Sequence, residues 1–297
     1  MDVKILQDIP PWEWPRGAGK TFLGILRDRQ ADASDRLVAA DLAGDSTVID
    51  DALANALISI LGDPGEPEEL RAQAAISQGP ALELASIDEF EDPDAVPISE
   101  KTFRKVKQAL RKVYLDSSVP KLVRRRVLEA AVRAPEEWQT SAIRTAYASA
   151  DPMWKLTAVF CMHYVRGFDK EILEALESAD PAIHYEAIGA AGNWEVAGAW
   201  PHVAALVKAK DTSKDLLLAA IEAVSTIRPR EAGTLLVDLL DSEDEDIVDA
   251  ASEAMSVAEV RTDDGFDEDA ADDDEDEDDE DEDEDDEDES GKHETIH

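Results

Sequence analysis

Few residues in this chain have the types and the spacing that catalysis, nucleotide binding or metal binding would need. Gly17-Ala18-Gly19-Lys20-Thr21 is the one apparent nucleotide motif. A phosphate-binding loop needs another glycine five residues before its Gly-Lys pair, after a hydrophobic strand, so that backbone N–H groups can wrap the phosphates. Trp14 occupies that position and prolines surround it. The plain interpretation of the segment is therefore the start of a helix.

Cys161 and His163 are the nearest pair of potential metal ligands. Two residues apart on a helix places side chains on diverging faces, and Cys161 lies in the apolar run AVFCMHY, where a buried, inert thiol is expected. His184 and His202 stand without another His or Cys at ligand spacing. We therefore predict no catalytic residue, no metal site and no cofactor.

Positive charge concentrates in one segment, because residues 101–133 hold 11 of the 29 bases. Four of these bases fall on one face of the first helix expected there. The candidate binding surface consists of Lys101, Arg104, Lys105, Lys112, Lys121, Arg124 and Arg125. Three interpretations stay open: a solvated face, a site for an acidic protein or a nucleic acid, and a docking site for the chain's own acidic tail, which a tether would hold at high effective concentration.

Two tryptophans, Trp12 and Trp14, alternate with prolines near the N-terminus. They are candidates for a partner-docking motif. A segment of this kind more often lies across the first repeat of an array and covers its otherwise exposed seam. We favour the covering role.

The elements that position these residues recur along the chain. Arg36 and Arg71 align at a distance of 35 residues, and each is followed eight residues later by a glycine, Gly44 or Gly79. Helical spacing of apolar residues precedes each copy, and strand signals are nearly absent, so an all-α fold is expected. The one long gap between copies contains an insertion at about residues 80–98, whose prolines and acids predict a loop.

The best copy is Asp180-Pro181-Ala182-Ile183-His184-Tyr185-Glu186-Ala187, followed by Gly192. This pattern resembles HEAT repeats, in particular the short bacterial type similar to phycobilisome-lyase HEAT-like repeats. The resemblance covers roughly residues 20–260. It implies an α-solenoid of about seven antiparallel helix pairs, whose long curved surface would hold protein partners.

Charge divides the chain into two parts. The 297 residues carry a formal net charge of −41, and residues 263–289 contain 23 acids and no base. Without that tract, and without Lys292 and Glu294, 46 acids and 28 bases remain, a net charge of −18. The tail has too little apolar area to offset its ordering entropy, so we expect disorder there. The acidic body makes nucleic acid an improbable partner, because phosphate contacts need bases.

These observations predict three parts: a capping extended segment at residues 1–18, a repeat solenoid at residues 19–262, and a disordered acidic tail at residues 263–297. We expect a non-enzymatic scaffold for protein partners, whose tail shields charge or docks on the body. The alternative is an acidic chaperone-like protein that binds a basic client through the tail. One cysteine, no secretory signal and no apolar stretch of roughly 20 residues predict a cytoplasmic protein without a membrane segment.

Overall fold

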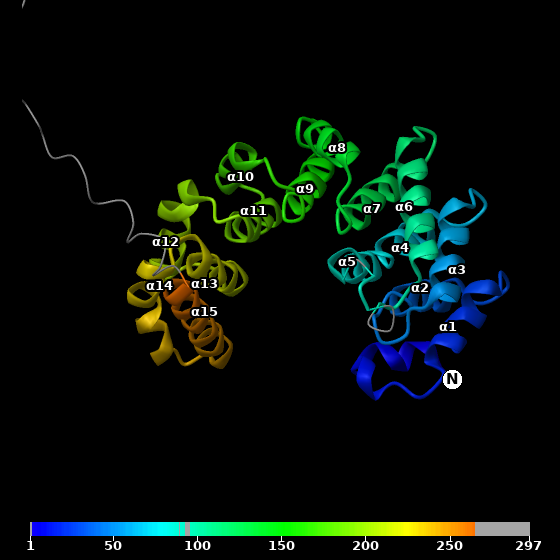
Figure 1. The fold of residues 1–297 in the computed structure, drawn as a ribbon, viewed down its shortest axis with the longest axis horizontal. Helices are drawn as coiled ribbons and strands as arrows, with labels where there is room; N and C mark the ends of the chain where they lie inside the picture. The colour runs from blue at the N-terminus through cyan, green and yellow to red at the C-terminus, as the bar shows by residue number, and fades with distance from the viewer. Residues whose placement is uncertain (1, 89, 93–95, 265–297) are drawn as a thin grey trace, which may run out of the picture.

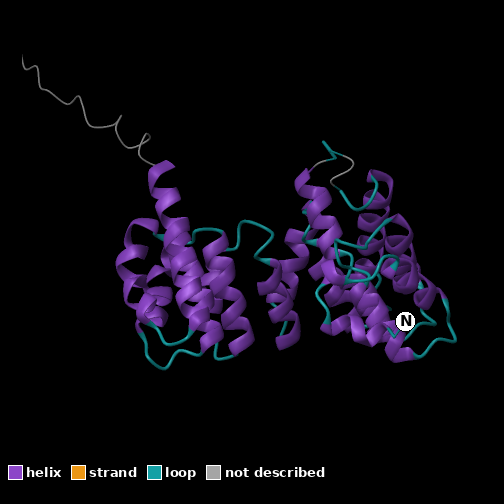
Figure 2. Ribbon diagram, turned by 90° about the horizontal axis from the view of Figure 1, so that it is seen from below, coloured by secondary structure: helices purple, strands orange, loops and turns teal. Residues whose placement is uncertain are grey.

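The computed structural model describes residues 2–88, 90–92 and 96–264, and every regular element in this part of the chain is a helix. Figure 2 shows these helices and their connecting loops. The all-α prediction is confirmed. The predicted disorder of the acidic tail lies outside the described residues, apart from residues 263 and 264, which end the last helix. No helix in the described part is long and apolar enough to cross a membrane.

Seven consecutive pairs of helices form the molecule, as the repeat spacing predicts. The pairs are α1 (Ala18–Arg27) with α2 (Ala33–Leu42), α3 (Asp51–Gly62) with α4 (Glu68–Ile76), α6 (Glu100–Leu115) with α7 (Lys121–Ala131), α8 (Glu137–Tyr147) with α9 (Pro152–Cys161), α10 (Asp169–Leu176) with α11 (Pro181–Asn193), α12 (Trp200–Lys208) with α13 (Lys214–Ile227), and α14 (Pro229–Leu236) with α15 (Glu245–Asp264). Short 3₁₀ helices at Ala197–Ala199 and Val237–Asp241 adjoin α12 and α14.

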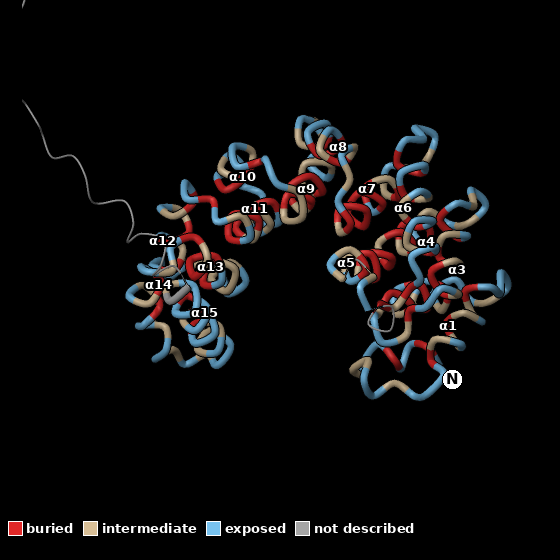
Figure 3. The backbone as a smooth tube through the Cα atoms, viewed as in Figure 1, coloured by how far each residue is buried: buried red, intermediate tan, exposed pale blue. Residues whose placement is uncertain are grey.

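The pairs stack side by side into an arc (Figure 1). The first helices of the pairs lie on the outer, convex side, and the second helices line the inner, concave side. The second helices touch their neighbours in an unbroken series from α2 to α15. Figure 3 shows buried residues where helices face each other. A pair of short helices cannot cover its own apolar faces, so stability depends on these neighbouring interfaces.

Local signals fix where the helices begin. The carboxylates of Asp32, Asp50, Asp151 and Asp180 accept hydrogen bonds from backbone N–H groups in the first turns of α2, α3, α9 and α11. Proline occupies the first position of α9 and α11, where its missing N–H costs nothing. The chemistry of these caps therefore supports the alternation of helix and turn along the chain.

Glycines at the ends of second helices allow adjacent pairs to approach closely. A Cβ added to Gly44 would lie 2.6 Å from the backbone oxygen of Ser77, in the next pair. A Cβ added to Gly192 would lie 2.9 Å from the Cα of Ala223, again in the next pair. Real Cβ atoms do not come this close to backbone, so the recurring glycine is a packing requirement.

The prediction of a loop over about residues 80–98 is wrong for its first part. Gly79–Asp88 forms an additional helix, α5, inside the arc. Ala81, Leu82 and Ala85 are buried on it, and α5 packs against α6 and α7. Pro80 stands in the first turn of α5, where proline is tolerated, so it does not prevent the helix.

The sequence predicts an extended segment at the N-terminus. In the structure this segment instead folds into two 3₁₀ helices at Val3–Asp8 and Pro11–Glu13. Val3 and Leu6 are buried, and the first of these helices packs against α2. Gly17, at a φ of 91°, then precedes α1, so the Gly-Lys segment is a helix start. The N-terminal residues thus cover the apolar side of the first pair.

A concave groove as the candidate functional site

The arginine that recurs in the repeat links the two helices of its own pair by a hydrogen bond. Arg36 donates a hydrogen bond from its guanidinium to the carbonyl of Leu26, at 3.1 Å. Arg71 does the same to Leu61, at 3.0 Å, and Arg124 to Tyr114, at 2.9 Å. Each acceptor lies ten residues earlier, near the end of the first helix, where the last carbonyls lack partners within the helix. The arginine is therefore a C-terminal cap supplied by the second helix.

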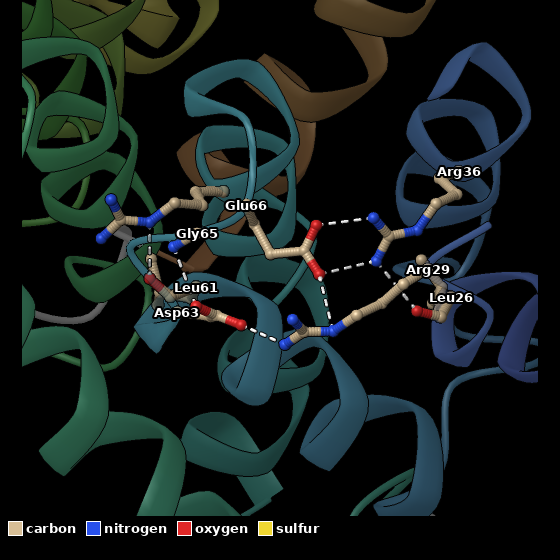
Figure 4. A network of polar contacts seen from close by, with 8 residues as sticks. Leu26, Arg29, Arg36, Leu61, Asp63, Gly65 and Glu66 are labelled. Atoms are coloured by element: carbon tan, nitrogen blue, oxygen red, sulfur yellow. Dashed lines mark hydrogen bonds and ion pairs between the residues drawn. The ribbon is translucent and has the colours of Figure 1, made fainter. Parts of the chain in front are cut away.

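Figure 4 shows that Arg36 also joins the first pair to the second. Its two terminal nitrogens donate to the carboxylate of Glu66, at 2.6 and 2.9 Å. Arg29 lies beside the same carboxylate and pairs with Asp63. The hydrogen bond from Arg36 holds the pKa of Glu66 below its ordinary value, and burial opposes this effect. Glu66 therefore stays ionised at neutral pH.

A groove of about 810 Å³ lies on the concave side of the arc. It crosses five consecutive second helices, α4, α7, α9, α11 and α13. The residues that line it are Ile76, Arg125, Arg126, Glu129, Arg133, Met153, Leu156, Phe160, Pro181, Ala182, Tyr185, Glu186, Ser213, Asp215, Leu216 and Leu218. Because stacked pairs place equivalent faces side by side, one groove is assembled from many repeats.

Most of the side chains that line the groove are apolar. Met153 is 44% exposed and Tyr185 is 45% exposed, although both lie inside the concavity. Leu156, Phe160 and Leu216 are half-buried beside them. Large apolar side chains that gather in one exposed hollow are typical of binding surfaces, whereas single exposed apolar residues need no explanation. The groove can therefore bury the apolar side chains of a partner.

A charged network lies beneath one part of the groove. Arg126 pairs with Glu129 at 2.6 Å and remains partly exposed. Below it, Thr157 donates to the other carboxylate oxygen of Glu129, at 2.6 Å, and accepts from Arg125 at 2.8 Å. Burial lowers the pKa of Arg125, and Glu129 offsets part of this effect. These bonds connect α7 to α9 and hold the Arg126 guanidinium at the groove surface.

The extra helix α5 positions Arg133, which lines the groove. Arg133, which follows α7, pairs with Glu83 on α5. Its guanidinium also lies 5.0 Å from the ring centre of Tyr164, within the range of cation–π attraction. Gly79 permits this arrangement, because a Cβ there would lie 2.7 Å from the Cδ of Arg133.

The bases of the candidate binding surface do not form one face. Lys101, Arg104, Lys105 and Lys112 are exposed on α6, one of the outer helices. Arg104 pairs with Glu100 on its own helix, and Lys105 donates to Asn55 on α3. Lys121 lies at the start of α7 and pairs with Asp151 at 2.6 Å. The surface therefore reduces to the outer side of α6.

Arg125 is buried rather than accessible, so its inclusion in that set was wrong, whereas Arg124 is partly buried in a structural role. Arg125 is only 5% exposed, within the network under the groove. Arg124 caps α6, and its guanidinium lies over the rings of Tyr114 and Trp154, at 5.3 and 5.7 Å. Consecutive basic residues on α7 point in different directions around the helix. Their spacing in the sequence did not show that other helices cover most sides of α7.

The N-terminal tryptophans have different environments. The Trp14 indole donates to the carbonyls of Leu6 and Ile9, at 3.0 and 2.9 Å, and packs edge-on against Phe22 of α1. Trp14 therefore fastens the N-terminal segment to the first pair. Trp12 is 78% exposed and is the one of the two that remains accessible.

The contact between His184 and His202 is the one feature of the histidines and the cysteine that the sequence did not predict. Cys161 is buried, and burial raises its thiol pKa well above the ordinary value. His163 is engaged by Glu186, with its Nε2 atom 2.7 Å from the backbone oxygen. His184 and His202, predicted to stand apart, instead meet with their Nε2 atoms 2.7 Å apart. No cluster of three or more potential metal ligands occurs within the described part of the chain.

Comparisons with known proteins agree with the repeat architecture. Residues 170–256 match the family model of HEAT repeats. The match is to HEAT repeats in general and does not distinguish the phycobilisome-lyase type that the motif resembles. No curated protein matches the chain.

Three solved structures are similar at low identity. Human deoxyhypusine hydroxylase in complex with glycerol is 15% identical, with a TM-score of 0.38 over 87% of this chain and 88% of that one. YibA of Escherichia coli is 15% identical, with a TM-score of 0.44 over 86% and 85%. A Kap121p mutant is 12% identical, with a TM-score of 0.41 over 82% of this chain and 32% of that one. Residues 170–256 therefore consist of HEAT repeats, and they form part of an α-solenoid of stacked helix pairs.

Proposed function

We propose that this protein is a non-enzymatic scaffold that holds a segment of a partner protein in its concave groove. The observation that carries the proposal is the exposure of Tyr185 and Met153 within a hollow that five consecutive second helices form. Aromatic residues, Met and Arg are enriched at protein interfaces, and the groove presents all three. Most polar side chains of the groove are engaged in contacts between helices, which favours binding over catalysis.

The groove chemistry indicates the kind of segment that fits. An apolar side chain would lie against Tyr185 and Met153, and an acidic residue could approach the exposed side of Arg126. The pairing of Arg126 with Glu129 leaves part of the guanidinium available, since its side chain is 45% exposed.

Alanine substitution tests this site directly. Tyr185→Ala and Met153→Ala should each weaken capture of the native partner, because a central buried anchor contributes about 2 kcal/mol, a roughly 30-fold change in Kd. Leu115→Ala is the matched control, since Leu115 is 64% exposed at the end of α6, outside the groove. Quantitative pull-down from the native cell identifies the partner, and titration of the purified partner then gives the Kd values. Equal affinity for all variants would place the partner elsewhere.

The acidic tail has a separate part in the proposal, as a shield of charge or as a ligand for the outer side of α6. Lys101 and Lys112 support docking there, since both are exposed on α6. Deletion of residues 265–297 should then strengthen binding of heparin at low salt. Unchanged heparin binding would exclude tail docking and leave the shielding role.

The second candidate function is a chaperone for a basic client, favoured by the 23 acids at residues 263–289. The same deletion separates the two functions. A scaffold keeps its partner without the tail, whereas a chaperone of this kind loses its client. Binding that survives about 0.5 M salt would also favour the groove, because exposed charges are strongly screened there.

A further inference from the structure

The repeat that contains α11 departs from the arginine pattern in a way that creates a new contact. His184, in the first turn of α11, occupies the position that Arg36, Arg71 and Arg124 hold in their helix pairs. Those arginines bind a carbonyl of their own pair. His184 instead reaches the next pair, where it meets His202 on α12.

The two imidazoles converge through the same atoms. Their Nε2 atoms lie 2.7 Å apart, and the ring centres lie 4.9 Å apart at an angle of 71°. In the neutral pair only one proton can lie between these nitrogens, so at least one lone pair points into the space between the rings. Neutral imidazole is the form that binds metal ions.

A carboxylate lies beside one of the rings. Oε1 of Glu177 lies 3.5 Å from Nδ1 of His202, the nitrogen that faces away from His184. Metal-binding histidines commonly have a carboxylate on the second ring nitrogen, which fixes the ring and raises its basicity. The Glu177 side chain is 80% exposed and that of His202 is 25% exposed, so water can reach the pair.

We propose that His184 and His202 bind one divalent transition-metal ion of the Cu²⁺, Ni²⁺ and Zn²⁺ class, which links α11 to α12. Imidazole nitrogen suits these ions, whereas Mg²⁺ and Ca²⁺ prefer oxygen ligands. Two nitrogens at tetrahedral angles around an ion lie about 3.3 Å apart. The rings therefore have to separate by about half an ångström and turn so that both Nε2 atoms face the ion, and their partial exposure leaves room for this movement. Water completes the coordination, so the affinity is lower than that of a closed four-ligand site.

Binding should strengthen the solenoid as well as occupy the pair. An ion that binds the folded chain stabilises it by mass action. The stabilisation should be smaller in acid, because protons compete with the ion for the same nitrogens. The inference goes beyond the scaffold function and does not depend on the groove.

The test uses the full chain in a buffer with excess Mg²⁺, which occupies the carboxylates of the acidic tail. Cu²⁺ is added, and electron paramagnetic resonance reports nitrogen ligands through their hyperfine splitting. Titration calorimetry with Ni²⁺ or Zn²⁺ gives the affinity. We expect nitrogen ligation in the wild-type chain, and its loss in His184→Ala, His184→Gln and His202→Ala. Glu177→Gln should weaken binding by about tenfold.

His163→Ala is the matched control, because it removes a histidine that lies outside the pair and should keep the affinity. Tail histidines contribute the same background to every variant, so the difference between variants isolates the pair. Circular dichroism without metal checks that each variant folds, and the Gln variant serves if the Ala variant does not. Equal nitrogen signal and equal affinity in the wild-type and the His184 and His202 variants would overturn the proposal, as would the absence of wild-type binding.

Discussion

At the scale of single residues, charge in this protein is mostly structural. Arg36, Arg71 and Arg124 are spaced like a surface motif, but each satisfies a helix-end carbonyl. Arg125 lies in a buried network with Glu129. A buried arginine is stable only when its donors find acceptors, and here the acceptors are backbone carbonyls, the carboxylates of Glu66 and Glu129, and the Thr157 hydroxyl. Removal of such a residue should therefore cost more than removal of an exposed one.

Arg36→Met should lower the free energy of unfolding by about 2–4 kcal/mol, since it removes a carbonyl cap and leaves the Glu66 carboxylate buried without its main partner. Arg29→Met is the matched control in the same network. The Arg29 side chain is 72% exposed, so its loss should cause little change. Urea unfolding of both variants measures the difference. Similar losses for the two would contradict the structural role of Arg36.

Glu66 gives the network a pH dependence. Its pKa is lower in the folded chain than in the unfolded chain, so its contribution to stability is present above the unfolded value, about 4.3, and is lost as the pH falls through the folded value. The stability difference between wild-type and Glu66→Gln should therefore be constant near neutral pH and shrink below about pH 4. Urea unfolding of the two proteins across this range checks the sign, and a difference that grows on acidification would refute it.

At the scale of helices, close approach between neighbouring pairs depends on small residues. Ala39, Ala75 and Ala187 are fully buried on second helices, and Gly192 lies against Ala223. Interiors are packed too densely to absorb an added methyl group without movement. The recurring small residue therefore sets the spacing of the array.

Gly192→Ala should destabilise the chain by about 1–2 kcal/mol, because overpacking against Ala223 outweighs the better helix propensity of alanine. Gly24→Ala provides the contrast within α1. A Cβ at Gly24 has nothing within 4 Å, so this substitution should stabilise by about 0.5–1 kcal/mol. Thermal unfolding of the two variants should move in opposite directions, and a shared direction would rule out the steric explanation.

At the scale of the whole molecule, stacking makes an arc with a concave groove in place of a compact core (Figure 1). Each pair contacts mainly its neighbours, so stability is close to a sum of local interfaces. The groove exists only because equivalent faces of five helices lie side by side.

The arc predicts an extended shape in solution. A compact domain of residues 1–264 would have a radius of gyration of about 18 Å. Small-angle scattering of a chain that ends at residue 264 should give a clearly larger value, since the pairs are spread along a curve. A value near the compact one would mean that the two ends of the arc meet.

The sequence by itself determined the helical fold, the number of pairs and the position of the repeating arginine and glycine, because these follow from local periodicity and from residues that recur at a fixed spacing. Caps such as Asp180-Pro181 acted within a few residues, so they too were visible. Helix α5 was missed, because proline near residue 80 marks a helix start as well as a loop.

Only the tertiary structure decided which residues meet across repeats. His184 and His202 are 18 residues apart and touch because α11 and α12 place them there. The groove residues Met153 and Tyr185 belong to separate pairs, and Arg125 is buried by helices distant in sequence. Periodicity states which face of a helix is apolar, but the curvature of the stack decides what that face contacts and what it leaves exposed.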